Sequence, residues 1–225
     1  MSYIYLIASV LVGSLLVVFL KPNNKKVRLL LAFSGAYLLS VTVLHLLPEV
    51  YNPTSQDNLV GIFILLGIVV QSILESFSKG AEHGHIHVHR KSDKFPMLLF
   101  LSLCIHAFSE GLPINFTDNN LLWGIVVHKV PIAVVLTTFL LHTNYSRKTI
   151  FLFLFVFALM SPLGVYFGES FSFFQIHSTK ITAFIVGVFL HISTIILFES
   201  TENHKFNVKK FGVILLGFLL SYLSL

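Results

Sequence analysis

The chain has 225 residues, of which 55% are hydrophobic and 11% are charged, and its formal net charge is +5. Soluble domains usually carry about 25% charged residues, and apolar runs recur along this whole chain, so the composition excludes an ordinary soluble protein. No basic face on a soluble element alternates with aromatic residues, so nucleic-acid binding is not expected. The single cysteine, Cys104, excludes an intrachain disulfide.

Eight apolar segments are long enough to be membrane-spanning helices, because a span needs about 20 mostly apolar residues. We expect these helices at residues 3–20, 27–47, 59–78, 95–116, 120–142, 149–168, 179–199 and 208–224. No stretch between them is long enough for a separate soluble domain. The sequence therefore predicts an all-α polytopic membrane protein with one transmembrane domain over residues 1–225.

Positive charges give the expected orientation of these helices. Of the 15 Lys and Arg residues, all except Lys129 and Lys180 fall in alternate loops, which predicts that those loops are cytoplasmic. Both termini are then expected outside, and the plasma (inner) membrane is the expected location. A homodimer is a candidate assembly.

The sequence HAFSEG, residues 106–111, places two ionisable side chains inside the apolar 95–116 segment. Such side chains are costly at membrane depth and usually face a cavity or a partner. His106 and Glu110 are four residues apart and therefore lie on one helix face. The next segment contains His128 and Lys129.

The depths of the two histidines agree. His106 lies 11 residues from Phe95, or about 16 Å along a helix, and His128 lies 8 residues from Asn120, or about 12 Å. These depths, counted from opposite sides, sum to about 28 Å, close to the thickness of the hydrocarbon core. We therefore expect His106, Glu110 and His128 to converge near the midplane, where two imidazoles and a carboxylate suit Zn²⁺ or a similar divalent ion.

Two prolines accompany these residues. Pro113 follows HAFSEG, and Pro131 lies three residues after His128. We expect each to kink its helix and to free a backbone carbonyl, which a hydrated metal path would satisfy. The expected result is a central metal site between two kinked helices.

The loop at about residues 79–94 is rich in histidine and is expected on the cytoplasmic side. It contains His83, His85, His87 and His89 in the sequence EHGHIHVH. Short His-rich tracts bind metal ions without a fixed geometry, so these residues are weaker metal ligands than the midplane group. A polar linker with incidental histidines is the alternative.

Other ionisable residues in or near the spans are His45, Glu49, Glu75, His142, His191 and Glu199. We expect His142 and His191 to hydrogen-bond neighbouring helices. His45 and Glu49, near the outer end of the 27–47 segment, either form an entrance for cations or serve in packing and capping. Glu75 and Glu199 lie at inner helix ends, where they line an exit or are simply solvated.

Several motifs, taken in chain order, resemble those of the ZIP (Zrt-/Irt-like) family of divalent metal transporters over nearly the whole chain. HLLPE at residues 45–49 ends the second span, and HAFSEG and HKVPIA match the family's two metal-site motifs. SPLGVYFG and GVFLHISTIILFES also resemble family segments.

This resemblance implies transport of divalent metal ions toward the cytoplasm, with zinc favoured and Fe²⁺, Mn²⁺ or Cd²⁺ as alternatives. It implies alternating access by an elevator-like motion, with His106, Glu110 and His128 as metal ligands. No enzymatic activity and no resident cofactor are expected.

The chain also departs from the family pattern. Ala107 replaces a usual asparagine, Ile132 replaces a frequent glutamate, and Lys129 stands where members with two bound metals have an acidic residue. An ammonium group there repels a second cation and forms an ion pair with Glu110 when no metal is bound. We therefore expect one metal ion per site, with water completing its coordination.

These departures leave two other hypotheses. One is a non-transporting, metal-sensing relative. The other is an intramembrane metal-dependent hydrolase, with Glu110 as the base acting on a metal-bound water. The sequence contains no HExxH motif, which disfavours the hydrolase.

Overall fold

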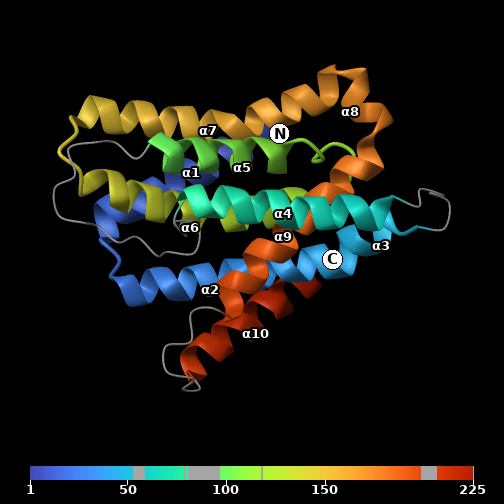
Figure 1. Ribbon diagram of the computed structural model, residues 1–225. Helices are drawn as coiled ribbons and strands as arrows, with labels where there is room; N and C mark the ends of the chain where they lie inside the picture. The colour runs from blue at the N-terminus through green and yellow to red at the C-terminus, as the bar shows by residue number, and fades with distance from the viewer. Residues whose placement is uncertain (53–58, 79, 81–96, 118, 199–206, 225) are drawn as a thin grey trace.

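The computed structural model describes residues 1–52, 59–78, 80, 97–117, 119–198 and 207–224. Within these ranges all of the regular secondary structure is helical, and most of the helices lie side by side along one direction (Figure 1). The elements are α1 Ser2–Leu20, α2 Asn24–Val41, η1 Thr42–Leu46, α3 Leu47–Val50, α4 Val60–Ser78, α5 Met97–Gly111, α6 Asn119–Leu141, α7 Arg147–Ser170, α8 Ser172–Ile176, α9 Ser178–Phe198 and α10 Val208–Leu223.

Six stretches of the described chain are long and apolar enough to cross a membrane. They are α1, the continuous stretch from α2 to α3, α4, α6, α7 and α9. The described part of α5 has 15 residues and α10 has 16, so both are shorter than the other spans expected from the sequence. Most helix ends lie within three residues of the expected positions, and the end of α5 is the exception.

Polar residues at the helix starts explain several of these boundaries. The side chains of Asn23, Ser146 and Asn207 each accept a hydrogen bond from a backbone N–H three residues later, at 3.0, 3.2 and 3.2 Å. These are the N-cap interactions that Asn and Ser favour. Three apolar helices therefore begin where the sequence changes from loop to span.

The second span contains a π-helical turn, η1, which the sequence analysis did not predict. Pro48 in α3 has no N–H to donate to the carbonyl of Leu44, so the regular bonding pattern is interrupted there. The wider turn lies where that bond is missing and carries His45. Such turns are rare and occur frequently at functional sites.

The helices form two groups with separate apolar cores. α1, α5, α6 and α7 enclose one core, which includes Val10, Leu103, Ala133 and Phe157. The other core lies mainly between α2, α4 and α9, with part of α6, and α10 packs against α2. The candidate site belongs to the first group.

Glycines bring particular helices into backbone contact. A Cβ on Gly164 of α7 would lie 2.1 Å from the carbonyl oxygen of Phe108 on α5, and one on Gly111 would lie 2.3 Å from that of Ser161. In the second group, a Cβ on Gly67 of α4 would lie 2.0 Å from the carbonyl oxygen of Phe184 on α9. Close approach through small residues is typical of helix packing in membranes.

Candidate metal site between α5, α6 and α7

α5 places His106 and Glu110 one turn apart on its buried face. His106 is 2% exposed and Glu110 is 1% exposed. The Nε2 atom of His106 lies 3.5 Å from Oε2 of Glu110. The helical spacing in the sequence therefore produces a real contact between an imidazole and a carboxylate.

α6 contributes His128, which is 1% exposed. The ring centroids of His106 and His128 are 6.3 Å apart, and the rings meet edge to face at 89°. The structure thus brings the two histidines together.

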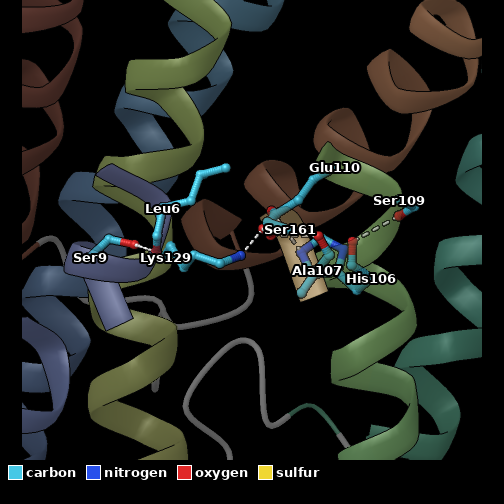
Figure 2. A network of polar contacts seen from close by, with 8 residues as sticks. All are labelled: Leu6, Ser9, His106, Ala107, Ser109, Glu110, Lys129 and Ser161. Atoms are coloured by element: carbon cyan, nitrogen blue, oxygen red, sulfur yellow. Dashed lines mark hydrogen bonds and ion pairs between the residues drawn. The ribbon is translucent and has the colours of Figure 1, made fainter. Parts of the chain in front are cut away.

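Lys129 forms an ion pair with Glu110, as expected for the site without a metal ion (Figure 2). Its Nζ atom donates to Oε1 of the carboxylate and also lies 5.4 Å from the centroid of the Phe157 ring on α7. Lys129 is 2% exposed, so both charges of this pair are removed from solvent. A buried charge needs such a partner, because an unpaired one is strongly destabilising.

Ser161 on α7 is the residue of this network that the sequence analysis did not name. It is fully buried, and its Oγ lies 3.0 Å from Oε1 of Glu110 and 2.6 Å from the carbonyl oxygen of Ala107. Figure 2 shows its side chain pointing from α7 toward the carboxylate. The signal in the sequence was a serine directly before Pro162 inside a strongly apolar span.

The two prolines of the site motifs have different places. Pro131 lies inside α6, which continues to Leu141, and having no N–H it leaves the carbonyl of Val127 without its usual helical bond. Pro113 lies beyond the end of α5, in the turns at residues 112–116. The expectation of a helix extending to residue 116 with a kink at Pro113 is therefore wrong, because this proline follows the helix instead of bending it.

The donor set is present, but its arrangement is that of an ion-paired site. Within the described ranges, no three His, Cys, Asp or Glu side chains are grouped so that they hold a metal ion as they stand. The ammonium group of Lys129 is bonded to the carboxylate of Glu110, the candidate metal ligand. His83, His85, His87 and His89 lie outside the described residues, as does Glu199.

The structure pairs two of the remaining ionisable residues. His191 of α9 lies with its Nε2 atom 2.6 Å from Oε2 of Glu75 of α4, which is the contact with a neighbouring helix expected for this histidine. His142 differs from the expectation, because its Nδ1 atom lies 2.6 Å from the carbonyl oxygen of Thr138 in the preceding turn of its own chain. Within the described chain, Glu75 and His191 belong to the α4–α9 group and not to the candidate metal site.

Comparison with known proteins adds the family. The sequence model described as "ZIP Zinc transporter" matches residues 81–224, which is more than half of the chain. The chain belongs to the ZIP family of zinc transporters. With its several apolar helices, this ZIP protein is an integral, multi-pass membrane protein.

Individual relatives match shorter regions. The ZIP chain is 35% identical to "Zinc transporter ZIP1" of Danio rerio over 91 residues, covering 38% of this chain and 30% of the relative. It is 26% identical to "Protein zntD" of Dictyostelium discoideum, covering 62% of this chain and 24% of that protein. It is 25% identical to "Zinc transporter ZIP9" of Micropogonias undulatus, covering 60% and 49%. The chain thus matches half or less of the length of each of these relatives.

Proposed function

We propose that this protein transports divalent metal ions, with zinc as the main substrate, toward the cytoplasm through a site formed by His106, Glu110 and His128. The observation that carries the proposal is the buried contact of His106 and Glu110 beside His128, in a chain of the ZIP family. Two imidazoles and a carboxylate are donors that zinc accepts readily. Charged groups at this depth in a membrane protein commonly mark an ion pathway.

The spacing of the donors supports zinc binding. Zinc bonds of about 2.0–2.2 Å at tetrahedral angles place two ligand atoms about 3.4 Å apart. The Nε2 atom of His106 and Oε2 of Glu110 are 3.5 Å apart. An ion therefore needs little movement of α5 to be held by both atoms, while the His128 ring approaches from α6 and water completes the shell.

Lys129 limits the site to one metal ion. Its ammonium group neutralises Glu110 before metal enters, and a divalent ion must displace it from the carboxylate to bind. A second ion would then lie close to this displaced positive charge. The Glu110–Lys129 pair re-forms when the metal leaves.

For the whole chain we propose eight spans with both termini outside, in the plasma (inner) membrane, and alternating access between the two helix groups. α5, α6 and α7 share the core of the first group and carry the site, while α2, α4 and α9 form the second core. Movement of one group against the other would expose the site to each side in turn. The His-rich loop is then a weak cytoplasmic acceptor for the arriving ions.

Zinc uptake into proteoliposomes tests this function. His106→Ala and Glu110→Ala should each abolish Zn²⁺ uptake, because each removes a metal ligand. His142→Ala is the matched control, since this histidine is exposed and bonds to its own helix. Uptake that persists undiminished in both site variants contradicts the assignment. Zn²⁺ binding without uptake would select the sensing relative, and cleavage of a lipid amide or a peptide by pure protein would select the hydrolase.

A further inference from the structure

We infer that Ser161 is a positioning residue for metal binding: it holds one oxygen of Glu110 so that the other faces His106 and binds the ion alone. The inference rests on the proposed function. Oε1 of Glu110 lies 3.0 Å from the hydroxyl of Ser161 and accepts a bond from Lys129, whereas Oε2 lies 3.5 Å from Nε2 of His106. The two oxygens thus have separate partners: Oε1 accepts hydrogen bonds from the protein, and Oε2 faces His106, where the ion would bind.

The hydroxyl of Ser161 has one proton and two acceptors nearby. They are Oε1 of Glu110 and the carbonyl oxygen of Ala107, at 3.0 and 2.6 Å. When Lys129 is bonded to Oε1, the Ser161 hydroxyl can donate its hydrogen bond to the Ala107 carbonyl, because Lys129 already serves as the donor to Oε1. When a metal ion displaces Lys129, rotation of the hydroxyl supplies Oε1 with a donor again. A buried carboxylate oxygen therefore keeps a hydrogen bond in both states, as buried acceptors require.

Ser161 keeps this position because α5 and α7 are in backbone contact. A Cβ on Gly111 would lie 2.3 Å from the carbonyl oxygen of Ser161, and one on Gly168 would lie 2.3 Å from that of Leu112. The helices carrying Ser161 and Glu110 cannot slide apart without breaking this packing. Lys129 and His128 come from α6, so α7 holds the carboxylate while α6 exchanges its ammonium group for an imidazole ligand.

The consequence is a specific effect on affinity. Without the hydroxyl, Oε1 lacks its donor once Lys129 has moved away, and the carboxylate is free to turn both oxygens toward the ion. We expect Ser161→Ala to weaken Zn²⁺ binding about tenfold, the size of effect known for a lost hydrogen bond to a charged group. The rate of the conformational cycle at saturating metal should change less than twofold, because the helix packing is intact.

The test uses the full chain with Zn²⁺ as the probe. Proteoliposome uptake gives KM and the maximal rate, and calorimetric titration of purified protein gives Kd. Ser161→Ala should raise KM and Kd about tenfold, and Ser161→Thr, which retains a hydroxyl, should restore both to within about threefold of the starting values. Ser102→Ala is the matched control: Ser102 is buried in α5 at 2% exposure, and its Oγ donates to the carbonyl of Leu99 in its own helix.

The outcomes separate this inference from the proposed function. Loss of maximal rate in Ser161→Ala with unchanged KM and Kd would show a packing role and overturn the inference. Equal KM and Kd in Ser161→Ala and Ser102→Ala would also overturn it, while uptake by the unmodified protein would leave the proposed function standing. Unmodified protein that neither binds nor transports Zn²⁺ would overturn both. If Ser161→Thr does not fold, the comparison of the two alanine variants decides alone.

Discussion

The ammonium group of Lys129 on α6 is bonded to the carboxylate of Glu110 on α5, and both residues are almost completely buried. The pair joins α5 to α6. It places the positive charge of Lys129 against Glu110, whose buried negative charge would otherwise be uncompensated. The contacts of Glu110 and Lys129 therefore determine how the site responds to mutation.

Removing the ammonium group of Lys129 should make the stability of the protein depend on bound metal. Lys129→Met leaves Glu110 buried without its ion-pair partner, which should lower the free energy of unfolding by about 3 kcal/mol. Zn²⁺ should then stabilise this variant more than the unmodified protein, because the ion no longer competes with an internal cation. Thermal unfolding with and without Zn²⁺ measures both effects. Lys148→Met, at the exposed start of α7, is the control and should change neither value. Equal stabilisation of all three proteins by Zn²⁺ would contradict this role of Lys129.

Replacing the ammonium group by a carboxylate should change the number of bound ions. In Lys129→Glu two carboxylates face each other, and a second Zn²⁺ relieves their repulsion. Calorimetric titration should give one high-affinity ion per chain before this change and two after it. Both titrations are made with His83, His85, His87 and His89 replaced by Ser, so that the loop binds none. A single high-affinity ion in the Lys129→Glu protein argues against our account of the stoichiometry.

The contact between α5 and α7 should not tolerate a methyl group. A Cβ at Gly164 would meet the carbonyl oxygen of Phe108 at 2.1 Å, so Gly164→Ala must push the two helices apart. Overpacking of this kind costs about 1–3 kcal/mol of unfolding free energy, and it should also reduce Zn²⁺ uptake because Ser161 moves away from Glu110.

Gly212→Ala is the matched control for that change. A Cβ at Gly212 in α10 has no atom within 4 Å, and alanine favours a helix by about 1 kcal/mol over glycine. This variant should be as stable as the unmodified protein or more so, with normal uptake. Thermal unfolding and uptake of both variants check the prediction, which is wrong if Gly164→Ala behaves like Gly212→Ala.

The Glu75–His191 contact should stabilise the second helix group without affecting metal binding. A cycle of Glu75→Ala, His191→Ala and the double variant should show a coupling energy of about 1 kcal/mol in unfolding, as expected for a contacting polar pair. KM for Zn²⁺ should stay within twofold in all three. A KM raised severalfold by either single change would place these residues on the metal path instead.

Sequence reasoning predicted the proximity of the candidate metal ligands because helix periodicity and distance along a helix are local properties. His106 and Glu110 share a face through their four-residue spacing, and His128 meets them because both depths follow from the helical rise. The ion pair of Lys129 followed from the charges alone. Whether these residues bind metal is still a prediction.

Ser161 was missed for a different reason. Its contact depends on which face of α7 meets α5, and this is set by the small residues Gly111, Gly164 and Gly168, whose partners cannot be read from one helix. The partner of His191 likewise depends on a contact between distant segments. The π-helical turn at His45 depends on the local break near Pro48. The end of α5 at Gly111 also differs from the expectation, because Pro113 follows the helix and does not bend it.

The electrical balance of the site follows from the lysine. Glu110 and Lys129 together carry no net charge, so in the proposed transport cycle the metal-free site would return with a neutral centre. In that cycle, one bound divalent ion would add two positive charges to the centre. An interior-negative potential of 100 mV would then favour inward passage by about 4.6 kcal/mol per ion, and it would leave the return step unaffected. Under the proposed function, voltage alone would concentrate the metal in the cell, without a companion ion moving in the other direction.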